Sequence, residues 1–124
     1  MIKKSRQRQA VKDCLIGRYD HPTAEMIYLS VKNDYPNISL GTVYRNLSLL
    51  TELGEIQRIS TGIGPDRFDG EIKPHCHFQC TRCKKVVDLN FMPDTNFDAE
   101  ANNGFEGQIE SHQIQFFGLC EACK

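Results

Sequence analysis

The chain has 124 residues, a formal net charge of -1 and six cysteines. That length allows two small domains or one of average size, and neither half could bury a large core without a metal or a partner chain. No apolar run suits a signal peptide or a membrane span, so we expect a cytoplasmic protein with no membrane partner. Thiols stay reduced in the cytosol, where paired cysteines favour a metal site over disulfides.

The small net charge conceals two halves of opposite sign. Residues 1–60 hold nine basic and six acidic residues, a net charge of +3, whereas residues 61–124 hold six basic and ten acidic residues, a net charge of -4. A basic N-terminal half suits contact with DNA, and an acidic C-terminal half suits cation binding. Random scatter of charge is the alternative explanation for a difference of this size.

Three segments of the N-terminal half carry apolar residues at helical spacing. Thr23 and Ser39 stand where the second and third segments need an N-cap. Gly17 and Gly54 stand just past the first and third segments, where a helix can end. An alternating strand and a turn rich in glycine follow, and this order predicts a winged helix-turn-helix. The predicted elements are helices over 7–16, 24–32 and 40–53 and strands over 55–59 and 67–69.

The third predicted helix has the pattern of a DNA-recognition helix. At about 100° per residue, Arg45 lies nearly opposite the apolar face, next to Gly41 and Thr42. Small neighbours let a helix approach DNA closely, and arginine can bind a guanine edge or a phosphate. An ordinary amphipathic helix with a solvated arginine is the alternative. The apolar face consists of Leu40, Val43, Leu47 and Leu50.

The chain changes character near residue 70. Residues 70–74 resemble a linker between a domain over 1–69 and a second domain over 75–124. The second domain has several short strand patterns and one polar stretch suited to a short helix. We therefore predict an α+β protein, with an N-terminal winged helix-turn-helix and a small C-terminal α/β domain. The predicted elements of the second domain are strands over 76–80, 86–90, 105–110 and 113–119 and a helix within 94–103.

Two Cys-x-x-Cys pairs form the strongest motif of the second domain. Each pair makes a tight turn that presents two sulfurs on one side, and four thiolates satisfy a closed tetrahedral zinc site. A redox dithiol is the rival interpretation, although such a site usually needs one pair near a helix N-terminus. Lys84 stands where knuckles of this kind often carry glycine. The predicted structural zinc ligands are Cys80, Cys83, Cys120 and Cys123.

A second group of potential ligands has no thiolate in it. Strand alternation places His75 and His77 on one face and Cys76 on the other. Imidazole and carboxylate donors favour Fe(II) or Mn(II) over a closed zinc site. Ordinary surface or core histidines are the alternative. The candidate ligands of this regulatory site are His21, Asp69, His75, His77 and Asp88.

No enzymatic motif is present, since the sequence has no nucleophile elbow, no phosphate-binding loop and no glycine-rich dinucleotide turn. We therefore expect a protein that is not an enzyme. A zinc-ribbon interaction module or thiol enzyme without DNA binding remains an alternative. The helix around Arg45 and the basic N-terminal half argue against it.

The whole pattern resembles the ferric-uptake-regulator (Fur) family. The match runs in family order along nearly the entire chain. Its most specific parts are the Thr-Val-Tyr-Arg-Asn-Leu run and the following His-x-His-x-x-Cys-x-x-Cys run. The matching stretches are 5–8, 21–28, 38–47, 67–69, 75–83, 111–112 and 118–123.

The resemblance implies a metal-bound repressor that binds a palindromic operator in double-stranded DNA as a homodimer. It assigns dimerisation to the second domain and implies that metal held between the domains sets the angle of the DNA-binding halves. It also supports the four zinc ligands and the five regulatory ligands given above. By the same analogy the DNA-binding residues are Ser39, Thr42, Tyr44, Arg45 and Asn46.

Aspartate at both position 69 and position 88 resembles the peroxide-sensing PerR branch of the family. Iron sensors more often carry glutamate at both positions. In the PerR branch, Fe(II) reacts with hydrogen peroxide and a ligand histidine becomes oxidised. His21 and His75 occupy the two oxidised positions. An iron- or manganese-responsive uptake regulator is the alternative within the family.

Two departures from the family pattern affect these expectations. The chain begins almost at the Ser5–Arg8 motif, so we expect the extra N-terminal helix common in the family to be shortened or absent. Some of the DNA contacts that this helix makes in the family are then expected to be missing. His112 matches a position that some relatives use in a further metal site. Cys76 and Thr95 stand where that site needs carboxylates, so we do not predict it.

Overall fold

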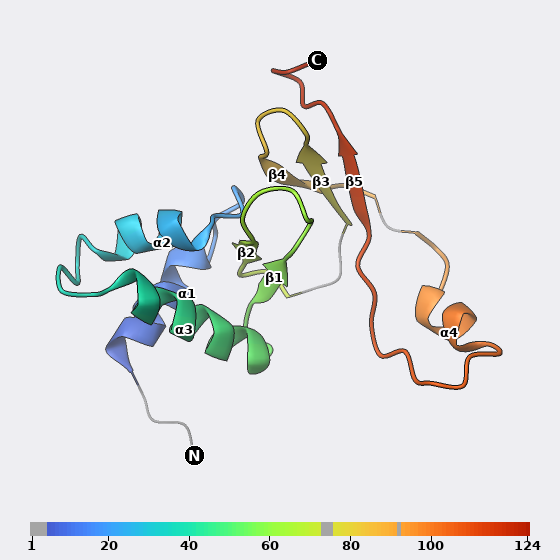
Figure 1. The fold of residues 1–124 in the computed structure, drawn as a ribbon, viewed down its shortest axis with the longest axis horizontal. Coiled ribbons are helices and arrows are strands. Elements are labelled where there is room, and N and C mark those ends of the chain that lie inside the picture. The colour runs from blue at the N-terminus through green and yellow to red at the C-terminus, as the bar shows by residue number, and fades with distance from the viewer. Residues whose placement is uncertain (1–4, 73–75, 92) are drawn as a thin grey trace.

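The computed structural model describes residues 5–72, 76–91 and 93–124. In Figure 1, α1, α2 and α3 gather beside the small β1–β2 sheet, β3, β4 and β5 form a second sheet, and α4 stands apart from both. The elements are α1 (Arg6–Leu15), α2 (Ala24–Val31), α3 (Leu40–Glu52), β1 (Gln57–Ile59), β2 (Arg67–Asp69), β3 (Cys76–Cys80), β4 (Val86–Leu89), α4 (Phe97–Asn102) and β5 (Gln115–Gly118).

The helix starts and ends follow local chemistry. The hydroxyls of Thr23 and Ser39 accept hydrogen bonds from the main-chain N–H groups three residues later, at 3.3 and 3.1 Å. These bonds satisfy donors that the first turn of a helix leaves unpaired. Gly17 and Gly54 both have φ of +73°, a conformation that glycine adopts without steric cost. The predicted caps and stops are therefore confirmed.

The hydrophobic core lies in the N-terminal half, where three helices pack on one another and on the β1–β2 hairpin. β1 and β2 pair antiparallel, with Arg58 opposite Phe68, and Thr23 adds an antiparallel bridge to Arg67. This arrangement confirms the winged helix-turn-helix. The buried core consists of Val11, Leu15, Ala24, Ile27, Val31, Ile38, Val43, Leu47, Leu50, Ile56 and Phe68.

The second sheet has the strand order β4-β3-β5 and is poor in buried apolar side chains. β3 pairs antiparallel with β4 and parallel with β5, which returns from far along the chain. The buried residues here are mainly cysteines, Val86, Gln79 and His77, while Phe116 and Phe117 on the edge strand stay exposed. A sheet with so little apolar burial needs another source of stability.

The predicted strand over 105–110 is wrong. The Asn102 side chain takes the place of a strand partner, because it donates to the Ile109 carbonyl at 3.1 Å and accepts from the Ile109 N–H at 2.8 Å. The segment therefore turns back on the end of α4 and joins neither sheet. The other predicted elements are present, most of them shorter than expected.

The described part of the chain contains no helix able to cross a membrane. The longest helix there, α3, has 13 residues, whereas a span needs about 20. Residues 73–75, which include part of the predicted linker and His75, lie outside the described residues.

Candidate metal centres

The parallel pairing of β3 and β5 brings the two cysteine turns together. Cys80 ends β3 opposite Gly118, and the Thr81 N–H donates to the Gly118 carbonyl at 2.8 Å. The four sulfurs lie within 4.8 Å of one another, and those of Cys83 and Cys120 are 3.8 Å apart. Tetrahedral zinc with sulfur at about 2.3 Å places ligand sulfurs about 3.8 Å apart, so the cluster fits this metal. Its members are Cys80, Cys83, Cys120 and Cys123.

Main-chain groups prepare the cysteine cluster for a cation. The N–H of Cys83 points at the Cys80 sulfur and lowers the pKa of that thiol to about 5. Thiolate is the form that binds metal, so this donor favours ligation. Lys84 has φ of 69°, the left-handed conformation for which glycine is better suited, and its ammonium group donates to the Thr81 carbonyl. The turn therefore forms without glycine at position 84.

A second cluster joins the two halves of the molecule. His21 precedes α2 and Asp69 ends β2, while His77 on β3 lies opposite Asp88 on β4. One donor atom from each of these four residues lies within 4.8 Å of the others. Two imidazole nitrogens and two carboxylate oxygens form a donor set suited to Fe(II) or Mn(II).

Short contacts hold this second cluster together. The Nε2 of His21 lies 2.8 Å from Asp88 Oδ1 and 3.2 Å from Asp69 Oδ2. The Nε2 of His77 lies 3.4 Å from Asp88 Oδ1 and 3.5 Å from Asp69 Oδ2. His21 and Asp69 are only 1% and 4% exposed. Polar groups this deeply buried are costly without partners, and a shared cation would compensate all four.

The carboxylates and imidazoles shift one another's protonation. Burial alone would lower the pKa of His21, but its contacts with Asp69 and Asp88 outweigh burial and raise it. Burial would raise the pKa of Asp69, but hydrogen bonds from His21 and His77 hold it well below its usual range. Without a metal, protonated His21 therefore supplies the positive charge that interacts with Asp69 and Asp88.

This proton makes the metal-free protein sensitive to pH. His21 has a raised pKa in the folded state, so its contribution to stability is complete below the unfolded value of about 6.5 and is lost as pH rises through the raised pKa. We expect the zinc-loaded protein without regulatory metal to melt at a lower temperature at pH 8.5 than at pH 6. Thermal melts of wild type and Asp69→Asn measure this, and an equal pH dependence in both would contradict it.

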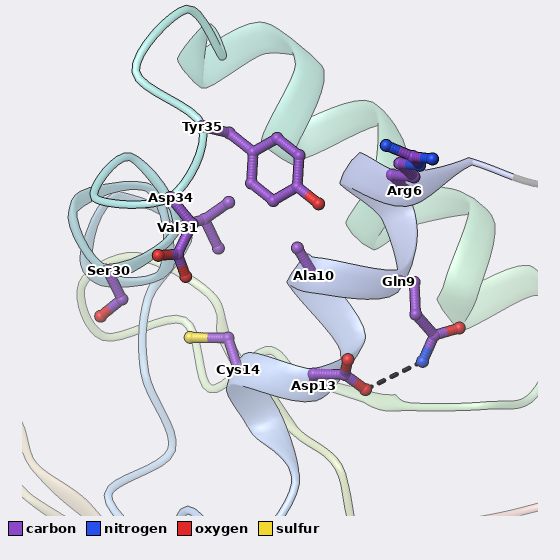
Figure 2. A pocket seen from close by; sticks show the side chains of 9 residues that line it. All are labelled: Arg6, Gln9, Ala10, Asp13, Cys14, Ser30, Val31, Asp34 and Tyr35. Atoms are coloured by element: carbon purple, nitrogen blue, oxygen red, sulfur yellow. Dashed lines mark hydrogen bonds between the residues drawn. The ribbon is translucent and has the colours of Figure 1, made fainter.

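Cavities lie on both halves of the molecule. One of about 300 Å³ is bordered by His77, Cys76 and Arg58, beside the second cluster. Another of about 710 Å³ lies between α1 and α2 and touches neither cluster. Figure 2 shows it lined by Cys14 and Tyr35 among other side chains, with Gln9 bonded to Asp13 at its rim. His77 is the one described member of the second cluster that lines the smaller cavity.

Four of the five predicted regulatory ligands come together, and the fifth, His75, lies outside the described residues. Cys76 belongs to neither donor cluster among the described residues. His112 contacts a carboxylate of α4, with its Nδ1 2.8 Å from Asp98 Oδ1 and its ring edge-on to Phe97. Sequence reasoning missed Arg67, which donates from Nη1 to the His21 carbonyl at 3.1 Å.

The predicted DNA-binding residues run from the N-cap of α3 through its first two turns. Val43, Leu47 and Leu50 face the core, whereas Tyr44 is 46% exposed. A chain of hydrogen bonds links the side chains of Ser39, Thr42 and Arg45, each 2.9 Å long, and Asn46 is half-buried nearby. The guanidinium of Arg45 thus lies along the exposed start of the helix.

Fold and clusters together define the class of protein: a winged-helix DNA-binding regulator with two metal-type sites, one of them shared between its halves. The model of the ferric uptake regulator family matches residues 1–117. The chain belongs to this family.

Individual relatives extend the comparison. The peroxide-responsive repressor PerR of Staphylococcus aureus is 32% identical over 123 residues, which cover 99% of this chain and 83% of that protein. The Helicobacter pylori ferric uptake regulator superposes with a TM-score of 0.81 at 27% identity, covering 98% of this chain and 82% of that one. For the Campylobacter jejuni peroxide stress regulator the TM-score is 0.78 at 28% identity, covering 94% and 88%.

Proposed function

We propose that the protein is a cytoplasmic, metal-dependent transcriptional repressor that senses hydrogen peroxide, and not an enzyme. One observation carries the proposal: two metal-binding side chains from the winged helix and two from the second sheet place their ligand atoms within 4.8 Å of one another. A metal held there favours the domain arrangement in which its ligands converge. The angle of the DNA-binding half then depends on whether the site is filled.

Each cluster takes the metal that suits its donors. Zn(II) in the four-cysteine cluster holds the second sheet together, and Fe(II) or Mn(II) binds between the halves. Iron(II), when bound, supplies an electron that reduces hydrogen peroxide, whereas manganese(II) does so poorly. The regulatory ligands are His21, Asp69, His77 and Asp88, with His75 as the fifth; His21 and His75 are the oxidation-sensitive pair.

Residues 1–69 bind DNA and residues 75–124 dimerise, so a homodimer presents two α3 helices to a palindromic operator. Ser39, Thr42, Tyr44, Arg45 and Asn46 face the DNA from each copy. The capped, exposed start of α3 supports this orientation, since helix N-termini and arginine both attract phosphate.

Aspartate at positions 69 and 88 and the resemblance to a peroxide-responsive repressor favour peroxide over metal level as the signal. An iron- or manganese-responsive uptake regulator is the second candidate, supported by the superposition on the Helicobacter pylori ferric uptake regulator. Membership of the regulator family disfavours a zinc-ribbon module without DNA binding.

A mobility-shift assay with zinc-loaded protein tests the proposal. We expect Mn(II) to strengthen operator binding at least tenfold, and Arg45→Ala to weaken the Mn(II)-loaded complex by about 1–3 kcal/mol, because Arg45 reaches a base or phosphate. Lys85→Ala is the matched control, since it removes a positive charge from the exposed turn of the second sheet. Operator binding that ignores Mn(II) contradicts the proposal, and wild-type affinity in Arg45→Ala contradicts the assigned face of α3.

A further inference from the structure

His21 has an uncommon main-chain conformation for a residue other than glycine. Its φ is 49°, in the left-handed region that side chains other than glycine rarely adopt. The next residue is Pro22, which restricts the preceding residue toward extended conformations. Something must therefore hold His21 in this conformation, because relaxation of φ would swing its ring away from Asp69 and Asp88.

Strand β2 supplies that restraint. The Arg67 guanidinium donates to the His21 carbonyl at 3.1 Å, and the Phe68 N–H donates to the Pro22 carbonyl at 2.9 Å. The carbonyl of His21 belongs to the planar peptide that joins it to Pro22, so the Arg67 bond restrains ψ of His21. Together with the Phe68 bond to the next carbonyl, it holds the main chain on the C-terminal side of His21 against β2.

We infer that Arg67 is a positioning residue of the regulatory site: its hydrogen bond to the His21 carbonyl keeps the His21 imidazole aimed at Asp69 and Asp88. The inference rests on the proposed function of this site. Asp69 ends the strand that carries Arg67. This short strand therefore positions two metal ligands, Asp69 directly and His21 through Arg67. Metal affinity thus depends on a side chain that bonds to the main chain.

A purely structural role for Arg67 predicts a different result. The Nε of Arg67 is buried and has no hydrogen-bond partner among the described residues. A buried, unpaired donor is unfavourable, so an apolar side chain of similar length removes that cost. Arg67→Met removes this unpaired donor together with the bond to the His21 carbonyl, and the two effects on stability oppose each other. We therefore expect a fold about as stable as wild type, and only the positioning role predicts that the variant also loses metal affinity.

The test compares zinc-loaded, full-length wild type with Arg67→Met and Arg67→Lys. For Arg67→Met we expect about tenfold weaker Mn(II) binding, equal to about 1.4 kcal/mol, with unchanged zinc content and melting temperature. Arg67→Lys keeps a donor and should stay within about threefold of wild type. Titration with Co(II) should give a changed visible spectrum only for Arg67→Met, because one imidazole no longer meets the metal.

A readout without regulatory metal separates this inference from the proposed function. The rings of His21 and His77 lie edge-on with centroids 5.2 Å apart, so their protons should show a nuclear Overhauser effect. We expect that signal in wild type and Arg67→Lys and its loss in Arg67→Met. Retention of the signal and of wild-type Mn(II) affinity in Arg67→Met overturns the inference, as does equal loss of affinity in Arg67→Lys. A wild type whose DNA binding ignores Mn(II) overturns the proposed function alone.

Discussion

Cys83→Ser should unfold the second sheet and abolish the proposed dimer while the winged helix stays folded. The apolar core lies in the N-terminal half, and the second sheet buries mainly cysteines, Val86 and two polar side chains. Strand β5 pairs with β3 only after a long connection, since 36 residues separate the two cysteine pairs. Ordering this connection costs conformational entropy, which another interaction must compensate. Structural zinc can contribute on the order of 10 kcal/mol, far more than the rest of this sheet provides.

The control for this experiment is the same substitution at a cysteine outside the cluster. Cys14 on α1 is half-buried and belongs to neither donor group, so Cys14→Ser should keep zinc, dimer and both sheets. Elemental analysis, sedimentation and amide hydrogen exchange measure the three properties. Full zinc content and an intact dimer in Cys83→Ser would show that the cysteine cluster is not what stabilises this half.

Features set by neighbouring residues could be predicted from the sequence. Thr23 and Ser39 cap helices because each hydroxyl reaches an N–H three residues away. The Cys-x-x-Cys spacing likewise predicts two sulfurs on each turn without any information on strand pairing. The predicted strand over 105–110 shows the limit of local patterns. Its apolar alternation suits a strand, but the Asn102 side chain makes hydrogen bonds to both main-chain groups of Ile109 and so replaces a strand partner.

Features set by pairing between distant segments could not be predicted from residue patterns alone. Strand patterns put His77 and Asp88 in strands, but only the register of β3 and β4 places them opposite each other. Residue type made His21 and Asp69 candidate ligands, and the family resemblance supported them, but nothing local in the sequence places them beside His77 and Asp88. Residue spacing also does not predict the left-handed conformation of His21 or the hydrogen bond from Arg67 to its carbonyl.

Hydrogen peroxide should oxidise His21 in Fe(II)-loaded protein and leave it intact in Mn(II)-loaded protein. The His21 ring is 1% exposed, so an oxidant in bulk solvent reaches it poorly, whereas one produced at the cluster meets it first. Peptide mass spectrometry after peroxide treatment detects the oxygen added to the ring. Iron-loaded protein should also lose at least tenfold in operator affinity, because an oxidised imidazole is a weaker donor and the halves separate.

His112 provides an internal control for this oxidation. Its side chain is 42% exposed and it belongs to neither donor cluster among the described residues, so indiscriminate oxidation should modify it before His21. Asp88→Glu is the matched variant, because a longer carboxylate can occupy the position that peroxide needs. It should keep Mn(II)-dependent DNA binding and show little oxidation of His21.

The pattern of modification decides between the two regulators of the family. Oxidation of His21 that requires iron and spares His112 identifies a peroxide sensor, since only the ligands of the cluster lie close enough to the metal to be selected. His75, the second predicted target, should be modified under the same conditions. Unmodified histidines in iron-loaded protein, with operator binding intact in peroxide, would instead identify a regulator whose signal is metal occupancy itself.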